Sequence, residues 1–113
     1  MPFIHVRTNT AVSADSAEQV KSALGKAITT LPGKSEQWLM VGIEPEQLLY
    51  FQGSDAPAAM VEVSIYGSAA AASCDAMTGK ICDILEGSLS IPSNRIYVKY
   101  TETENWGWNG SNF

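Results

Sequence analysis

The sequence predicts an α+β fold with two layers, in which a four-stranded mixed sheet carries two helices on one face. Two observations support this. A strand pattern, a helical pattern and a second strand pattern follow one another, and the whole series then repeats. In each half the two strands begin about 35 residues apart, from Phe3 to Trp38 and from Val61 to Ile96, which fits a right-handed parallel β-α-β unit. The 113 residues match the usual size of one domain, so we expect a single domain over residues 1–113.

The first half predicts a strand, a helix and a second strand. Apolar alternation favours a strand over 3–7. Ser13, Asp15 and Ser16 offer N-cap oxygens for a helix, which Pro32-Gly33 ends. That helix has one apolar stripe, made of Val20, Leu24, Ala27, Ile28 and Leu31. The almost continuously apolar segment 38–43 is typical of a central strand, and residues 48–51 indicate a short extra strand.

The second half repeats this series. A strand is predicted over 60–66 and another over 95–100. The helix between them has a second apolar stripe, made of Met77, Ile81, Ile84, Leu85 and Leu89, and Ile91-Pro92 ends it. The tail adds Trp106, Trp108 and Phe113, and such an aromatic segment is expected to pack on the sheet or on a neighbouring subunit.

The sequence pattern predicts strands that are apolar on both sides, so one apolar face of the sheet would be left without helices to cover it. The residues concerned are Leu39, Met40, Val41, Val61, Val63, Ile96 and Val98. Two helices can cover only one face of the sheet. An apolar second face would need another covering surface, so we expect the chain to associate with copies of itself.

The charge balance argues against several classes of partner. The net charge is −5, with seven Lys and Arg against 12 Asp and Glu, and no basic stripe is present. Nucleic acid and anionic membranes are therefore not expected as partners, and a two-layer RNA-binding module is disfavoured because no basic-aromatic sheet motif occurs. No apolar stretch approaches the roughly 20 residues of a membrane span, and no signal peptide is apparent. We therefore expect a cytoplasmic protein.

The cysteines and the histidine do not indicate a metal site or a cofactor. Cys74 and Cys82 would lie about 12 Å apart along one helix, too far for a disulfide. We expect them to be buried small residues in a reducing compartment. His5 has no ligand partner at metal-binding spacing.

Met1-Pro2 is the most informative dipeptide of the chain. An initiator Met before a small residue such as Pro is usually removed, which would leave a free secondary amine at the start of a strand. An α-amine titrates near pH 7.7–8.0, so modest desolvation would make it a general base at neutral pH. Pro2 alone fits better a common second residue that leads into a strand.

Several further motifs occur in order along the chain. They are Gly33-Lys34, Pro45-Glu46-Gln47-Leu48, Phe51-Gln52-Gly53-Ser54, Pro92-Ser93-Asn94-Arg95-Ile96-Tyr97, and Trp106-Gly107-Trp108-Asn109-Gly110-Ser111 with Phe113. With Met1-Pro2, their order and spacing resemble those of the macrophage migration inhibitory factor (MIF) family of the tautomerase superfamily. The resemblance covers essentially the whole chain. It implies a homotrimer whose sheets form a barrel with the helices outside, and keto–enol tautomerisation of phenylpyruvate-like acids.

The resemblance also implies roles for individual residues. Pro2 matches the catalytic base, Lys34 the cation that holds the substrate carboxylate, and Tyr66 a backbone N–H donor. Tyr97 matches a pocket aromatic that the neighbouring subunit supplies. The pocket-lining positions match Trp38, Trp106, Trp108 and Phe113. Taken singly, Lys34 also fits a solvated turn lysine, and the aromatic residues also fit ordinary strand packing.

Three departures from the family pattern change what is expected. Lys99 stands where asparagine is common, which adds a second cation near the pocket mouth and favours doubly charged substrates. Ile65-Tyr66 replaces a Ser-Ile pair, and the bulkier group is expected to narrow the pocket. A Cys-x-x-Cys motif is absent from 57–61, so thiol–disulfide oxidoreductase activity is not expected.

One alternative function stays open. The chain could be a MIF-like cytokine or binding protein that keeps the fold with a vestigial site. Because family members are exported without a signal peptide, the resemblance leaves secretion, and with it a receptor partner, open.

Overall fold

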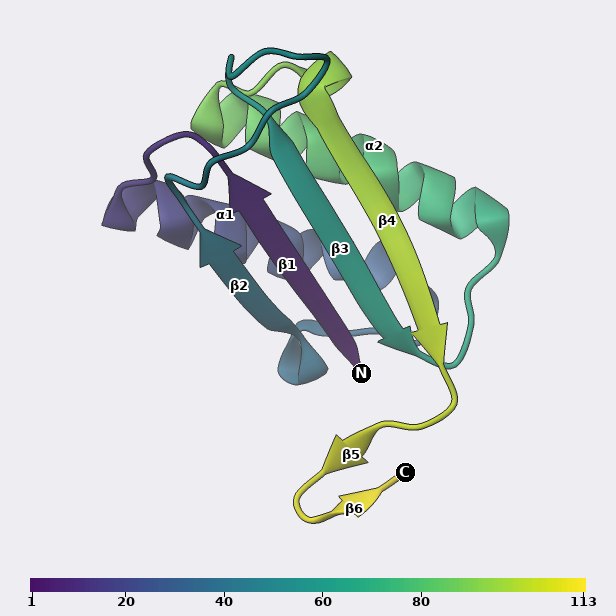
Figure 1. Ribbon diagram of the computed structural model, residues 1–113. Coiled ribbons are helices and arrows are strands. Elements are labelled where there is room, and N and C mark those ends of the chain that lie inside the picture. The colour runs from purple at the N-terminus through teal and green to yellow at the C-terminus, as the bar shows by residue number, and fades with distance from the viewer.

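The computed structural model describes all 113 residues and confirms the predicted fold class. The first unit comprises β1 (Pro2–Thr8), α1 (Ala14–Ala27) and β2 (Met40–Glu44), with the short 3₁₀ helices η1 (Ile28–Thr30) and η2 (Glu36–Trp38) before β2. The second comprises β3 (Ala59–Tyr66), α2 (Ala71–Leu89) and β4 (Ile96–Thr103), with η3 (Ser93–Arg95) before β4. Strands β5 (Gly107–Trp108) and β6 (Ser111–Asn112) form a hairpin that projects beyond one end of the sheet (Figure 1).

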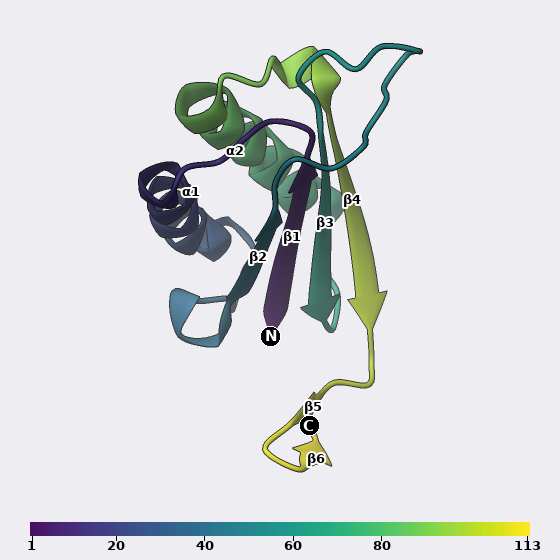
Figure 2. The same ribbon diagram turned by 60° about the vertical axis from the view of Figure 1, so that its left-hand side comes forward.

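The sheet has the order β2-β1-β3-β4. Strands β1 and β2 are parallel, as are β3 and β4, and the two units join through the antiparallel pair β1 and β3. Both helices lie on one face of the sheet and leave the other uncovered (Figure 2). The predicted duplication of β-α-β units is therefore confirmed. Neither helix has the length and apolar character needed to cross a membrane.

Local signals set the helix ends. The Ser13 hydroxyl accepts a hydrogen bond from the Ser16 N–H at 3.1 Å, which caps α1. Asp15 in its first turn and Lys26 in its last turn complement the helix dipole. Helix α2 ends at Ser90, which takes a left-handed conformation with φ 57° and stops the helix just before Ile91-Pro92.

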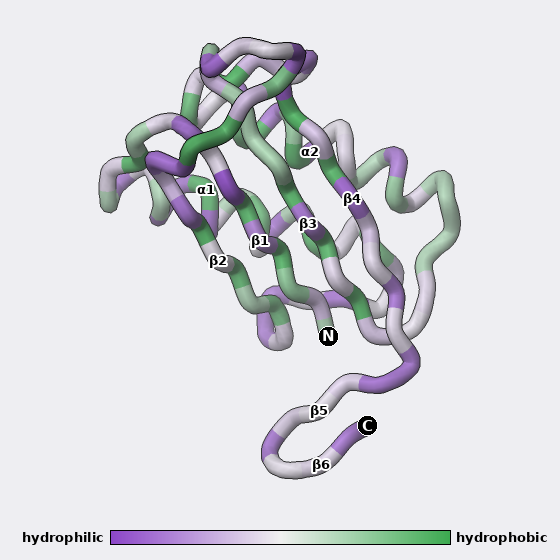
Figure 3. The backbone as a smooth tube through the Cα atoms, in the orientation of Figure 1, coloured by the Kyte–Doolittle hydropathy of each residue, from purple (hydrophilic) through white to green (hydrophobic).

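The core lies between the helices and one face of the sheet. Strands β1 and β3 alternate between buried and half-buried residues along their whole length, and Figure 3 shows hydrophobic and hydrophilic residues following one another along these strands. The core includes both predicted helical stripes at Val20, Leu24, Ala27, Ile28, Leu31, Met77, Ile81 and Leu85. Burying these side chains supplies the main stabilisation of the fold.

The sequence predicts a central strand over 38–43, and this prediction is wrong. Strand β2 starts at Met40, lies at the sheet edge and pairs only with β1, while Trp38 lies in η2. Its apolar run arises because Leu39, Val41 and Ile43 pack against the core, while Met40 on the other face is 68% exposed. The extra strand expected over 48–51 is also absent, because this loop has no neighbouring strand within the chain and forms only one bridge, between Phe51 and Ser54.

The expectation of two apolar sheet faces is wrong for most of the residues that suggested it. Val61, Val63, Ile96 and Val98 all pack on the helix-covered side. The uncovered face carries polar and charged groups instead, with a hydrogen bond between His5 and Glu44 at 2.8 Å and an ion pair between Arg7 and Glu62. This face remains without a covering layer, but its chemistry is mixed rather than apolar.

Candidate active site

The start of β1 lies at the end of the sheet beside the C-terminal hairpin (Figures 1 and 2). Pro2 is buried and pairs in register with Ile65 on β3. A proline suits the first position of a strand because it has no N–H to donate to the ladder. The Met1 carbonyl oxygen accepts a hydrogen bond from the Tyr66 N–H at 3.0 Å. The chain start is thereby held against the end of β3.

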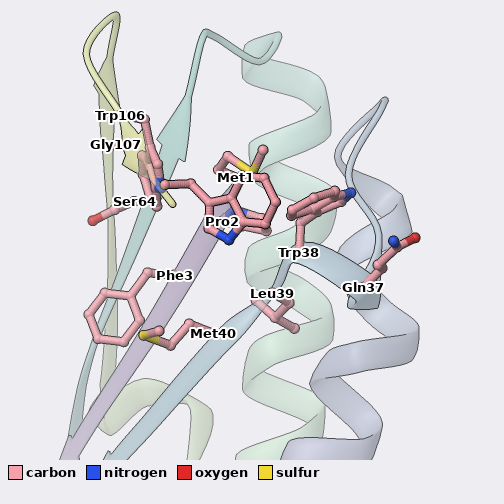
Figure 4. Close-up of a pocket in the computed structure, with 11 residues that line it drawn as sticks. Met1, Pro2, Phe3, Gln37, Trp38, Leu39, Met40, Ser64, Trp106 and Gly107 are labelled. Atoms are coloured by element: carbon pink, nitrogen blue, oxygen red, sulfur yellow. The ribbon is translucent and has the colours of Figure 1, made fainter. Parts of the chain in front are cut away.

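A cavity of about 810 Å³ opens at this position (Figure 4). Pro2 and Met1 lie between the indole rings of Trp106 and Trp38 in the close-up. The other lining residues are Phe3, Gln37, Leu39, Met40, Ser64, Gly107 and Trp108. Seven of the 11 lining residues are hydrophobic, so the cavity suits a ligand with an apolar or aromatic body.

Lys34 is held at the end of β3 by a turn and a hydrogen bond. Gly33 supplies the left-handed backbone of that turn with φ 78°, and the Lys34 N–H donates to the Leu31 carbonyl. The Lys34 ammonium donates to the Tyr66 carbonyl oxygen at 2.7 Å. An ammonium has three donors, so two remain for an anionic group.

Four aromatic rings form a continuous series from β3 through the tail to η2. Tyr66 meets Phe113 with ring centroids 5.7 Å apart, and Phe113 stacks on Trp108 at 6.1 Å. Trp108 then meets Trp38 edge-on at 5.1 Å and 90°. Edge and offset contacts of this kind stabilise aromatic pairs beyond their buried area. The tail therefore packs at the cavity of its own chain.

The N-terminal amine is electrostatically unusual. Burial lowers the pKa of the Met1 α-amine below its usual value of 8.0, and the nearby Lys34 cation lowers this pKa further. Both effects disfavour the charged ammonium. An amine in these surroundings keeps a larger neutral, proton-accepting fraction at neutral pH than an amine in water.

The structure brings most of the predicted site residues together in one chain. Pro2, Trp38, Trp106 and Trp108 line the cavity, and Lys34, Tyr66 and Phe113 connect to it through the contacts described above.

Tyr97 and Lys99 do not join this cavity. Tyr97 pairs in register with Met60, which pairs with Arg7, so it lies five residues along the sheet from the Pro2 position. At about 3.3 Å per residue this is roughly 17 Å. Lys99 lies opposite Glu62 on the uncovered face and forms no ion pair within the chain.

The sequence did not predict that three residues on the uncovered face, namely Phe3, Met40 and Ser64, line the cavity. Phe3 is the register partner of both Met40 and Ser64, so these side chains lie side by side across three strands. Alternation places each of them on one face of its own strand, but only the register between strands shows that they meet.

The remaining chemistry-bearing side chains are not grouped as a metal site. No three His, Cys, Asp or Glu side chains lie in an arrangement that could hold a metal ion. Cys74 and Cys82 are free and half-buried on α2, and burial raises the pKa of both thiols. A raised pKa keeps a thiol protonated and poorly reactive.

The whole chain is similar to proteins of one family. The family model described as macrophage migration inhibitory factor (MIF) matches residues 1–113. The chain is 34% identical to macrophage migration inhibitory factor of Xenopus laevis, over 100% of this chain and 99% of that protein. It is 33% identical to the Meriones unguiculatus protein of the same name, again over 100% and 99% of the two chains.

Solved structures agree with this. The crystal structure of Leishmania major MIF2 has a TM-score of 0.94 and 34% identity, covering 100% of this chain and 97% of that one. A MIF homologue from Prochlorococcus marinus has a TM-score of 0.89 and 27% identity, covering 98% of each chain.

Proposed function

The chain belongs to the macrophage migration inhibitory factor family of the tautomerase superfamily, and from that premise we propose that it is a keto–enol tautomerase of phenylpyruvate-like acids. The observation that carries this proposal is the placement of the chain start. Pro2 lines a largely apolar cavity, and the Met1 α-amine joined to it has its pKa lowered by burial and by the Lys34 cation. Proton abstraction next to a ketone needs a base of this kind.

In the proposed mechanism Pro2 is the general base once Met1 is removed. The neutral secondary amine takes a proton from the carbon next to the ketone of the substrate, and the electron pair of that C–H bond moves to form the enol double bond. The π electrons of the C=O bond move to the ketone oxygen, which takes a proton from solvent and becomes the enol hydroxyl. The protonated amine then gives its proton to solvent, which restores the base. The same steps in reverse convert the enol to the ketone. No cofactor takes part.

Lys34 and the aromatic walls supply binding and orientation. The two free donors of the Lys34 ammonium suit a substrate carboxylate, and charge-assisted bonds of this kind are among the stronger ones in proteins. The indoles of Trp38, Trp106 and Trp108 suit an aryl ring. Removal of Met1 also removes the carbonyl that occupies the Tyr66 N–H, which frees that donor for substrate oxygen.

The proposed assembly is a homotrimer in which the uncovered sheet faces meet as a barrel. The absence of any layer on that face supports it, as does the outward position of Tyr97, which is 60% exposed. In this assembly Tyr97 and Lys99 of one copy reach the cavity of the next, and Lys99 favours doubly charged substrates. Sedimentation equilibrium should give three times the mass of one chain, and a monomer would contradict the assembly.

The direct test of the proposed function compares the wild-type chain with Pro2→Gly. We expect purified wild-type protein, freed of Met1, to interconvert enol and keto phenylpyruvate, and Pro2→Gly to lose about 10²-fold in kcat/KM. Glycine keeps an amine but removes the ring that fixes its direction and shields it from water. Intact mass spectrometry confirms that both chains have lost Met1, and enol absorbance gives the rates.

The same test separates the second candidate function, a cytokine-like binding protein. The curated relatives are named for inhibition of macrophage migration, which favours this candidate. If wild type and Pro2→Gly are equally inert, the enzyme proposal fails and the binding role remains.

Replacing Lys34 with methionine should weaken substrate binding and shift the pH profile. Loss of a charge-assisted hydrogen bond, which contributes about 1.5–3 kcal/mol, should raise KM roughly 10- to 100-fold. The amine acts when unprotonated, so kcat/KM rises as pH rises through its pKa. The Lys34 cation lowers the pKa of the Met1 amine, and we expect it to act in the same direction on the Pro2 amine one residue away. Lys34→Met should therefore move this acid limb to higher pH.

The control for this prediction is Lys26→Met, which removes an exposed lysine at the end of α1. Its KM and pH profile should match those of wild type. Thermal melting of both variants checks that the lost bond to the Tyr66 carbonyl has not unfolded the site. An unchanged KM for Lys34→Met would remove Lys34 from the proposed site.

A further inference from the structure

Tyr97 is exposed, yet its ring is held in one orientation. Its phenol hydroxyl has no hydrogen-bond partner in the chain, and most of the side chain faces solvent. One edge-to-face contact fixes the ring, in which Phe51 and Tyr97 lie with centroids 4.7 Å apart at an angle of 75°. Phe51 comes from a loop more than 40 residues away in the sequence. The orientation of Tyr97 therefore depends on how firmly that loop is placed.

The backbone at Phe51 is fixed by a tight turn. The Phe51 N–H donates to the Ser54 carbonyl at 2.9 Å, and the Ser54 N–H donates to the Phe51 carbonyl at 3.1 Å. Gln52 and Gly53 at the centre of the turn have φ values of 53° and 73°. Positive φ at both central residues is characteristic of the type I′ hairpin turn.

Arg95, the last residue of η3 and two residues before Tyr97, binds this turn. Its guanidinium donates to the carbonyl oxygens of Phe51 at 3.2 Å and Ser54 at 3.0 Å. It also donates to those of Ala56 at 3.1 Å and Pro57 at 2.9 Å. The same guanidinium lies 5.3 Å from the centroid of the Phe51 ring, within cation–π range. One side chain thus fixes both the backbone and the ring of the residue on which Tyr97 rests.

We propose that Phe51 and Arg95 are positioning residues, which preorganise Tyr97 for the cavity of a second copy of this chain. This inference rests on the proposed function, because Tyr97 lies far from the cavity of its own chain. A side chain fixed before binding loses less conformational freedom when substrate arrives. Phe51 and Arg95 touch no substrate in this proposal and act through Tyr97 alone.

A double-mutant cycle tests the proposal, with kcat and KM measured for phenylpyruvate. Phe51→Leu and Tyr97→Leu should each raise KM about 3- to 10-fold, with kcat within about twofold of wild type. The double variant should have the KM of Tyr97→Leu alone, because Phe51 has no effect once its target ring is gone. Tyr50→Leu is the matched control, since Tyr50 neighbours Phe51, is 69% exposed and contacts neither Arg95 nor Tyr97 in the pairs above. Its KM should equal that of wild type.

A second variant and a spectroscopic measurement keep the test valid if one variant fails to fold. Arg95→Lys keeps the charge but lacks the planar fork that reaches several carbonyls, so it should raise KM in the same direction. In NMR spectra, the ring protons of Tyr97 should lose the ring-current shift caused by Phe51 in Phe51→Leu, and this shift should become smaller in Arg95→Lys. Thermal melting identifies any variant that fails to fold, and the other then decides.

The outcomes separate this inference from the proposed function. Additive effects on KM, or an unchanged KM in Phe51→Leu beside a raised KM in Tyr97→Leu, would overturn the positioning role. An active wild type whose Tyr97→Leu variant keeps its KM would remove Tyr97, and the positioning role with it, while leaving Pro2 in place. An inactive wild type would overturn the proposed function itself.

Discussion

Removal of Met1 should raise kcat/KM for phenylpyruvate by about 10²–10⁴-fold over the chain that keeps it, which is the usual contribution of a general base. While Met1 is present the Pro2 nitrogen is an amide and cannot accept a proton. The Met1 carbonyl also occupies the Tyr66 N–H at 3.0 Å, and Met1 itself lines the cavity. One cleavage therefore creates the base, frees a hydrogen-bond donor and clears space.

The measurement uses a single preparation of the chain that retains Met1. Treatment with a methionine aminopeptidase should lower the intact mass by one methionine and raise the rate of enol–keto conversion in the same samples. Treatment with a heat-inactivated aminopeptidase is the control. Equal rates for the two masses would show that the Pro2 amine is not the base.

Replacing Asn9 with alanine should lower the free energy of unfolding by about 2–4 kcal/mol. The Asn9 side-chain nitrogen donates to the carbonyls of Leu49, Asp55 and Ala56 at 3.2, 2.9 and 3.0 Å, and its oxygen accepts from the Ala58 N–H at 2.9 Å. Alanine leaves the half-buried Leu49 carbonyl and the Ala58 N–H without this partner, while the Ala56 carbonyl keeps its bond from Arg95 and the Asp55 carbonyl is open to water. Each unsatisfied group costs about 1–3 kcal/mol.

Asn94→Ala is the matched control, because Asn94 is exposed and its replacement should change stability by less than about 0.5 kcal/mol. Denaturant unfolding of both variants should be measured at one protein concentration, since self-association couples stability to concentration. If the two variants unfold at the same midpoint, the side chain of Asn9 does not stabilise the loop.

The elements of the fold could be predicted because their signals are local. The Ser13 cap, the two apolar helical stripes and the turn at Pro32-Gly33 each depend on residues close together in the sequence. The place of a strand within the sheet depends on strand order instead. An apolar run such as 38–43 looks the same in a central strand as in an edge strand whose core-facing residues are packed.

Some residues of the candidate site could be predicted from the sequence, and others depend on how the strands pair. The resemblance to the family, rather than any one local pattern, assigned Pro2, Lys34 and the tail tryptophans to the site. Strand ends and turns place these residues in or beside the cavity. Phe3, Met40 and Ser64 meet only through register, which periodicity does not contain. Tyr97 and Lys99 lie outside the cavity of one chain, and their part in it stays a prediction that depends on a second copy.

Residue 1 and residue 113 lie at the same end of the molecule, next to the cavity (Figure 1). An affinity tag or fusion partner on either terminus would therefore alter the proposed site, at the N-terminus by acylating the amine and at the C-terminus by displacing Phe113. Surface immobilisation or dye labelling should instead use an exposed position on α2 such as Lys80. Rates compared between tagged and untagged chains would otherwise include the effect of the tag on the proposed site.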